Sequence, residues 1–197
     1  MLMALVLVSA SVFAAVLIAA ATGGEEGASN AGERRFEGAT LPPGVEVPPF
    51  RLRDENGDHV AMKSLRGKPV IVTFLYTHCE DTCPTQAQQV RSALDELGED
   101  VPALAIAVEP ERDTQRSARA FLSEQRVLGR MRFVLGSRDE LEKVWEAFAV
   151  EPQRDDLEHS GRFVLVDPKG VQRVSFPVDQ ATPERLAHDL RLLADGA

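Results

Sequence analysis

The chain has 197 residues, of which 44% are hydrophobic and 27% charged, and its formal net charge is −9. An acidic surface disfavours binding to nucleic acid or anionic lipid and favours cations or basic partners. No charged side chain occurs in residues 1–22, so the net charge belongs to the part of the chain that follows them.

Residues 1–22 are almost entirely apolar. At about 1.5 Å per residue, a helix of this length spans the roughly 30 Å hydrocarbon core of a bilayer. We therefore expect a transmembrane anchor or a signal segment, and Ala19-Ala20-Ala21 suits cleavage by a signal peptidase. Arg34 and Arg35 follow the segment and no Lys or Arg precedes it. That charge bias alone favours a cytoplasmic domain, whereas the thiol chemistry discussed below favours an extracytoplasmic one.

Residues 23–45 lack apolar periodicity and are rich in Gly, Ala, Glu and Pro, which is typical of a flexible linker. Residues 46–197 are then long enough for one domain that buries about two thirds of its unfolded surface.

In chain order, this domain begins with a predicted hairpin, residues 50–54 and 59–62, around the turn Asn56-Gly57. Alternating strands and helices follow, and apolar runs or one-face spacing mark each of them. The expected strands are 70–75, 101–108, 131–135, 162–166 and 171–176. A helix following Cys83 ends at Gly98, one capped by Asp113 or Thr114 ends near Gly129, one follows the capping box Ser137–Glu140, and one starts at Thr182-Pro183.

Strands that alternate with helices predict an α/β fold with a parallel sheet, closed by a final hairpin. If residues 114–135 are a helix-strand insertion, the remaining order is β-α-β-α-β-β-α. This order resembles the thioredoxin-like fold, with the hairpin as an N-terminal extension.

Both cysteines, Cys79 and Cys83, follow the apolar strand 70–75 at the expected start of a helix. One helical turn separates them, about 6 Å between α-carbons, which suits either a disulfide or two thiolates on one metal ion. The partial positive charge of a helix N-terminus lowers thiol pKa and helps both reactions. A purely structural disulfide is a further alternative, but it would restrain almost no chain.

Four histidines are candidates for a third ligand: His59, His78, His159 and His188. His78 adjoins Cys79, and neighbouring residues of a strand point to opposite sides, so we expect it to be exposed or packed elsewhere. His59 lies in the hairpin and His188 on the polar side of the last helix. His159 precedes the strand 162–166, in the loop that faces the cysteines in thioredoxin-like folds. Thioredoxins have a cis-proline in that loop, whereas the nearest preceding proline here is Pro152.

Two thiolates and one imidazole favour copper, because soft sulfur holds Cu(I) and nitrogen also permits Cu(II). Zinc is the competing interpretation, since two cysteines, one histidine and a water also bind zinc. Acidic residues flank the candidate ligands and either attract cations or a basic partner or form a solvated rim: Glu80, Asp81, Asp155, Asp156 and Glu158.

Over roughly residues 48–195 the chain resembles the Sco/SenC family of copper proteins. The resemblance rests on segment 50–54 with Gly57, Gly67-Lys68-Pro69, segment 74–79 through Cys83-Pro84, segment 110–114, and His159 followed by 163–167 and Gly170. Glu109 stands where the family usually has Asp, and Gln115 where it often has Pro. Asp113 matches an aspartate of the family for which no role is assigned.

The resemblance implies a membrane-tethered domain outside the cytoplasmic membrane, with Cys79, Cys83 and His159 as copper ligands. Its members help to assemble the CuA site of cytochrome c oxidase, by delivering copper or by reducing the thiols that receive it. The implied partners are the copper-bearing oxidase subunit, a copper donor protein and a thiol reductant. Such a factor is not an enzyme in the turnover sense.

The alternative function is an extracytoplasmic thiol-disulfide oxidoreductase in which Cys79 attacks and Cys83 resolves. The three-residue spacing and the lack of a cis-proline argue against it. A peroxiredoxin-like peroxidase is weaker, because Val72 and Tyr76 occupy positions of its Pro-x-x-x-Thr/Ser-x-x-Cys pattern.

Overall fold

The computed structural model describes residues 35–153 and 161–196. In this part of the chain, no helix is both long and apolar enough to cross a membrane. Residues 1–22, for which the sequence predicts an anchor or signal, lie outside the described residues.

A six-stranded mixed sheet forms the centre of the domain, in the order β1-β8-β7-β4-β5-β6. The strands are β1 (Ala39–Thr40), β4 (Val70–Leu75), β5 (Ala103–Ala107), β6 (Met131–Val134), β7 (Arg162–Val166) and β8 (Gln172–Pro177). Strands β4, β5 and β6 are parallel, as the alternating pattern predicts. The expectation of a parallel sheet is wrong for β7, which runs antiparallel to β4, because the chain returns to the other side of β4 in the opposite direction.

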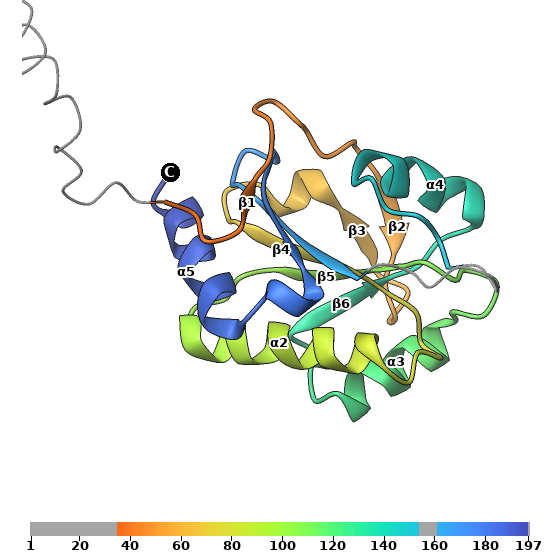
Figure 1. Cartoon of the computed structure of the whole chain (residues 1–197). Helices are drawn as coiled ribbons and strands as arrows, with labels where there is room; N and C mark the ends of the chain where they lie inside the picture. Colours follow the sequence, from red (N-terminus) through yellow and green to blue (C-terminus); the bar gives the residue numbers. More distant parts are fainter. Residues whose placement is uncertain (1–34, 154–160, 197) are drawn as a thin grey trace, which may run out of the picture. The chain divides into compact units, whose positions relative to one another are not determined.

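Within residues 35–153 and 161–196, four α-helices cover the sheet: α2 (Thr82–Leu97), α3 (Gln115–Glu124), α4 (Arg138–Ala147) and α5 (Pro183–Ala194). Figure 1 shows α2, α3 and α5 on one side of the sheet and α4 on the other. Two short 3-10 helices, η1 (Met62–Leu65) and η2 (Val178–Gln180), complete the described elements. The predicted α/β fold is thus confirmed.

The predicted hairpin is confirmed as the separate sheet of β2 (Arg51–Arg53) and β3 (His59–Ala61). Its turn uses Gly57 at φ +84°, a conformation that L side chains rarely adopt. An isolated bridge from Arg53 to Leu135 connects the hairpin to the chain just after β6.

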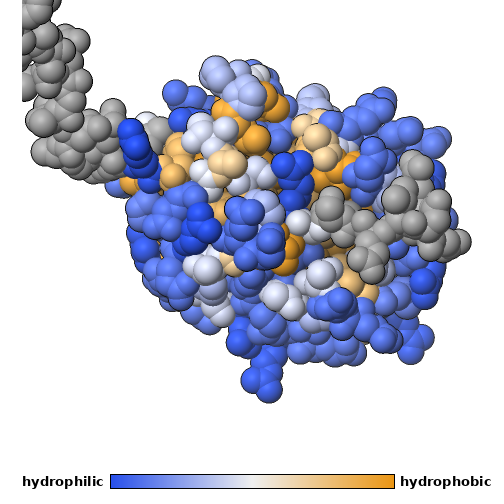
Figure 2. Space-filling model, viewed as in Figure 1, coloured by the Kyte–Doolittle hydropathy of each residue, from blue (hydrophilic) through white to orange (hydrophobic). Residues whose placement is uncertain are grey.

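The core lies on both faces of the sheet, and every residue of β4 and β5 is buried. The inward stripes predicted for the helices are confirmed by the burial of Ala87, Val90 and Leu94 on α2 and of Leu186, Leu190 and Leu193 on α5. The face of the molecule in Figure 2 is mainly hydrophilic, with smaller hydrophobic areas between. This is expected when the apolar sides of the helices are buried against the sheet and the polar sides face solvent.

The second helix is shorter than predicted. Thr114, rather than Asp113, caps α3, because its side-chain hydroxyl accepts a hydrogen bond from the Ser117 N–H. The helix ends at Glu124 instead of near Gly129, because Arg126 adopts a positive φ of 57°, which no α-helix accommodates.

The folded unit begins at Phe36, inside the segment 23–45 that the sequence suggests is a linker. Strand β1 pairs with the edge strand β8, and the N–H groups of Glu37 and Gly38 donate to the carboxylate of Asp189 at 2.9 and 3.0 Å. Two strand residues are too few for a periodicity, so local sequence carries no sign of this pairing.

Candidate metal centre

Cys79 lies in the turn between β4 and α2, and Cys83 lies in the first turn of α2. Cys79 is 8% exposed and Cys83 fully buried, and they are not joined by a disulfide. The Asp81 side chain makes no capping hydrogen bond to α2. Instead the Cys83 N–H donates to Sγ of Cys79 at 3.2 Å, and the Thr82 hydroxyl lies 3.7 Å from the same sulfur. The Cys79 sulfur therefore accepts a hydrogen bond from a backbone N–H in the first turn of the helix, as the side-chain oxygen of an N-cap residue would.

These contacts make the two thiols unequal. Burial opposes ionisation of Cys79, but hydrogen bonds from Cys83, Asp81 and Thr82 outweigh it and lower the pKa of the Cys79 thiol. Burial raises the pKa of Cys83, and its hydrogen bond to Cys79 raises it further. Burial and a hydrogen bond to Cys79 likewise raise the pKa of Tyr76, so the phenol stays neutral beside the sulfur. Cys79 is the thiol more ready to act as a thiolate.

A buried polar network holds this turn in place. The Thr73 hydroxyl, in the middle of β4, donates to Oε1 of Gln86 on α2 at 2.6 Å and to the carbonyl of Arg162 at 3.1 Å. Gly161 packs against the same glutamine, because a Cβ at Gly161 would lie 2.6 Å from Nε2 of Gln86. The start of β7 is thereby fixed against the helix that carries Cys83.

The third predicted ligand, His159, lies outside the described residues, as do Asp155, Asp156 and Glu158. His59 is exposed on β3, and His188 on α5 contacts Asp189 at 2.8 Å. The structure thus brings Cys79 and Cys83 together and leaves the place of His159 a prediction.

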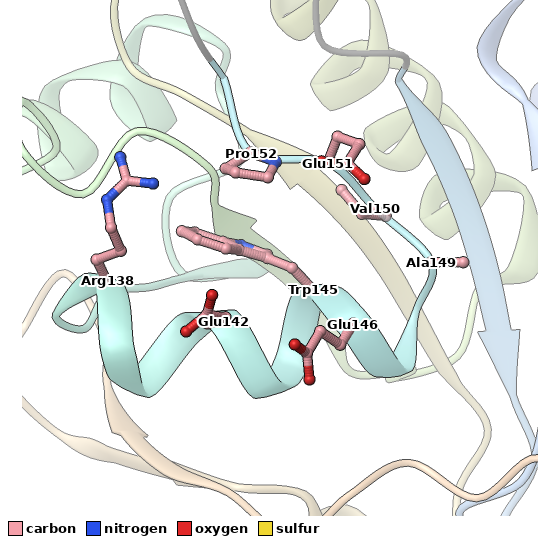
Figure 3. A pocket seen from close by; sticks show the side chains of 8 residues that line it. All are labelled: Arg138, Glu142, Trp145, Glu146, Ala149, Val150, Glu151 and Pro152. Atoms are coloured by element: carbon pink, nitrogen blue, oxygen red, sulfur yellow. The ribbon is translucent and has the colours of Figure 1, made fainter.

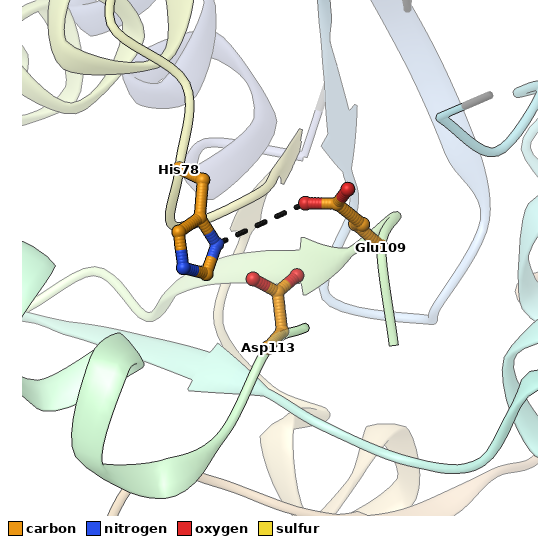
Figure 4. A group of neighbouring side chains, drawn as sticks. All are labelled: His78, Glu109 and Asp113. Atoms are coloured by element: carbon orange, nitrogen blue, oxygen red, sulfur yellow. Dashed lines mark ion pairs between the residues drawn. The ribbon is translucent and has the colours of Figure 1, made fainter. Parts of the chain in front are cut away.

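His78 has a partner that the sequence interpretation missed (Figure 4). Its Nδ1 lies 3.9 Å from Oε2 of Glu109, and donor atoms of His78, Glu109 and Asp113 all lie within 4.8 Å of one another. Asp113 accepts from the Thr77 N–H at 2.8 Å, which fixes its carboxylate beside the residue that precedes His78. Among the described residues, this is the one group of three or more potential metal ligands that lie so close. The sequence could have predicted this cluster, because His78 follows β4 and the two acidic residues follow β5. Parallel neighbouring strands bring such residues together at the carboxyl edge of the sheet.

A pocket of about 380 Å³ lies between α4 and the chain that follows it (Figure 3). Its lining combines Trp145 with three carboxylates: Glu142, Glu146 and Glu151. Among the residues that the structure describes, neither a cysteine nor a histidine lines it.

The fold and the site together define the class of protein: a thioredoxin-like α/β domain with two thiols where the first long helix begins. Residues 39–195 match the sequence model of the SCO1/SenC family. The chain belongs to this family.

Individual relatives agree with this assignment. The chain is 32% identical over 155 residues to the mitochondrial SCO1 homolog 1 of Arabidopsis thaliana, a match that covers 75% of this chain and 45% of that relative. It is 28% identical over 139 residues to the SCO1 protein homolog of Bacillus subtilis, covering 66% of this chain and 72% of the relative. The chain therefore spans less than half the length of the plant relative.

A solved structure, that of Bradyrhizobium japonicum ScoI with copper bound, is similar with a TM-score of 0.65 and 34% identity. The match covers 75% of this chain and 99% of that one.

Proposed function

We propose that this chain is a copper-binding assembly factor that delivers copper to the CuA site of cytochrome c oxidase, or prepares that site. The observation that carries the proposal is the contact between Cys79, just before α2, and Cys83 in the first turn of that helix, in a chain of the SCO1/SenC family. Copper is the cargo of this function, and the copper-bound ScoI structure supports the choice of metal.

The side chains present fit Cu(I). Sulfur is the preferred ligand of a soft monovalent ion, and Cys79 already has a lowered pKa. Cys83 has to lose its proton on binding, so uptake of copper releases protons. The two sulfurs leave room for a nitrogen ligand, which would also make Cu(II) acceptable.

His159 is the proposed third ligand, and the chain connectivity supports it. Gly161 lies against Gln86, three residues after Cys83 on α2. Two residues of chain span at most about 7 Å, which is short enough for a ligand two positions before Gly161 to reach the start of this helix.

We further propose an extracytoplasmic location, with residues 1–22 as a membrane anchor and the acidic domain facing the copper-bearing oxidase subunit. A copper donor protein and a thiol reductant are then required, because thiols outside the cytoplasm are readily oxidised. The apolar character of residues 1–22 and the thiol pair support this placement.

The test is a Cu(I) titration of the purified, reduced chain against a competing chelator, in parallel with His159→Ala. We expect one tightly bound Cu(I) per chain and at least tenfold weaker binding in the variant, about 1.4 kcal/mol. His188→Ala is the matched control, since that imidazole contacts Asp189 instead of the thiols. Unchanged Cu(I) affinity in His159→Ala would show that His159 is not a ligand. Weak Cu(I) binding by the unchanged chain would contradict the proposed copper-binding function.

A thiol-disulfide oxidoreductase is the second candidate, and the unequal thiols favour it. The Cys79 thiolate would attack a disulfide of the substrate and form a mixed disulfide, expelling one substrate thiolate. The Cys83 thiol, after losing its proton, would then displace the second substrate thiolate and leave Cys79–Cys83 oxidised. If the chain reduces a disulfide in a model exported protein with multiple turnovers, and His159→Ala does so at the same rate, this function is favoured over copper delivery.

A further inference from the structure

His78, Glu109 and Asp113 lie outside the thiol pair and have no part in the proposed copper site. His78 comes from the turn after β4, and Glu109 and Asp113 from the turn after β5. The three side chains converge in Figure 4, with the imidazole facing both carboxylates.

Two buried carboxylate oxygens of this cluster have no hydrogen-bond donor. Asp113 is 92% buried, given its exposed fraction of 8%, and its Oδ2 makes no hydrogen bond. Oε2 of Glu109 is likewise buried without a hydrogen-bond partner. A buried carboxylate oxygen without a donor is costly, and here two of them face the same imidazole.

The spacing of the donor atoms suits one metal ion. Ligands at about 2.0–2.2 Å from a common ion lie roughly 3–4 Å apart. The 3.9 Å between Nδ1 of His78 and Oε2 of Glu109 is already in this range, and all three donors lie within 4.8 Å. The His78 side chain is 40% exposed, so the site has a route to solvent. A metal ion on Nδ1 would replace the contact of this nitrogen with the Thr77 hydroxyl at 3.1 Å.

The donor set also indicates which ions would bind. One imidazole nitrogen and two carboxylate oxygens suit the borderline divalent cations of the first transition row, such as Mn²⁺ and Zn²⁺. Ca²⁺ and Mg²⁺ prefer oxygen alone, and Cu(I) prefers the nearby sulfurs. Glu109 is already paired with Arg112 through its other oxygen at 3.2 Å, and a divalent ion would further reduce the repulsion between the two carboxylates.

We infer that His78, Glu109 and Asp113 form a second metal site, which binds a divalent first-row cation independently of the thiols. It places a hard-ligand site beside the soft one, on the same edge of the sheet. The inference does not depend on whether Cys79 and Cys83 carry copper.

The first test removes the thiols. Zn²⁺ is titrated by calorimetry into the full chain carrying Cys79→Ser and Cys83→Ser, with His78→Ala, Glu109→Gln or Asp113→Asn added singly. We expect one Zn²⁺ per chain, bound at least tenfold more weakly when any of the three is replaced. Asp113→Asn keeps an oxygen for the Thr77 N–H, and His78 is exposed, so these replacements leave the local fold intact.

Two matched controls separate the site from general binding to an acidic surface. His188→Ala removes an imidazole that also contacts a carboxylate, and Glu111→Gln removes an exposed carboxylate that pairs with Arg138. Neither change is expected to alter Zn²⁺ affinity. Equal Zn²⁺ affinity in all variants would overturn the inference. A lack of Zn²⁺ binding by the chain without the thiols would overturn it as well.

A second measurement needs no cysteine substitution. Mn²⁺ is poorly matched to thiolates but suits carboxylate and imidazole ligands. In the unchanged chain, Mn²⁺ is expected to broaden the NMR signals of the His78 ring and of the Thr77 and Asp113 amides, and His78→Ala is expected to abolish this. Broadening that is uniform over the acidic surface would contradict the site.

Discussion

The Thr73 hydroxyl and the Gln86 carboxamide meet at 2.6 Å in the interior between β4 and α2. Both side chains are fully buried, and the same hydroxyl also reaches the Arg162 carbonyl at the start of β7. One polar contact therefore connects the strand before the cysteines, the helix that carries Cys83, and the strand that follows residues 154–160.

Replacing Thr73 by Val keeps the shape of this side chain but removes its hydroxyl. Gln86 and the Arg162 carbonyl then lose a buried donor, and we expect the free energy of unfolding to fall by about 1–3 kcal/mol. Urea unfolding followed by circular dichroism measures the change. Ser64→Ala is the control, because its hydroxyl bonds to the Ala61 carbonyl in an exposed place, where the expected change is within about 0.5 kcal/mol. A loss for Thr73→Val no larger than that of the control would contradict the role of this network.

The two thiols should differ in their reaction with iodoacetamide. Cys79 has the lower pKa and is slightly exposed, whereas Cys83 is buried with a raised pKa. We expect Cys79 to be alkylated first at pH 7, because the thiolate is the reacting form. Mass spectrometry of peptides after a short reaction identifies the modified residue.

The Cys83→Ala variant tests the cause of this difference. It removes the thiol that donates to Cys79 but keeps the backbone N–H, so the pH at which Cys79 reacts half-maximally should rise. If that pH does not move, the side chain of Cys83 has no part in lowering the pKa of Cys79.

The capping box of α4 should give a pH-dependent contribution to stability. Glu140 accepts from the Ser137 N–H at 2.9 Å, and this hydrogen bond, with that from the Ser137 hydroxyl, lowers the pKa of Glu140. A lowered pKa in the folded state means stabilisation that is present above the unfolded pKa, about 4.3, and is lost as pH falls through the folded value. The stability gap between the unchanged chain and Glu140→Gln should therefore close on acidification from pH 7 to pH 3. Glu146→Gln, on the same helix without a capping contact, should not reproduce this closure in urea titrations.

The folded unit should need residues 36–45. A chain that starts at residue 46 lacks the two N–H donors of the fully buried Asp189. We expect it to be less stable than a chain starting at residue 35 by at least about 2 kcal/mol, because the buried carboxylate loses both backbone donors and keeps only its contact with His188. Asp189→Asn in both chains removes the charge and should reduce the difference. Equal stability of the chains starting at 35 and 46 would instead support the linker boundary derived from sequence.

Local patterns were sufficient for most of the fold. The strand Val70–Leu75 and the capping box at Ser137 were predicted with the bounds observed, since each is fixed by neighbouring residues. Strand β1 was missed because its pairing with β8 depends on residues far away in the sequence. The Thr114 cap could not be separated from Asp113 by sequence alone, because the Asp113 carboxylate is held by Thr77 of another segment.

The candidate site was predictable only in part, for the same reason. Cys79 and Cys83 are only four positions apart, and they meet even though Cys79 lies before α2 instead of on its first turn. The sequence predicts that His78 is exposed or packed elsewhere, and it is exposed. The alternation of side chains along a strand is not the reason, because β4 ends at Leu75 and His78 lies in the turn beyond it. Its contact with Glu109 follows from the pairing of β4 with β5, which is a property of the whole sheet.

The close approach of Gly161 to Gln86 has an evolutionary consequence. A Cβ at position 161 would lie 2.6 Å from both Nε2 of Gln86 and Cγ2 of Val178. A larger residue at 161 needs smaller or shifted side chains at both 86 and 178, and a shorter residue at 86 also gives up the contact with Thr73. Positions 73, 86, 161 and 178 are therefore expected to change together, with substitutions that are tolerated in combination and rejected one by one.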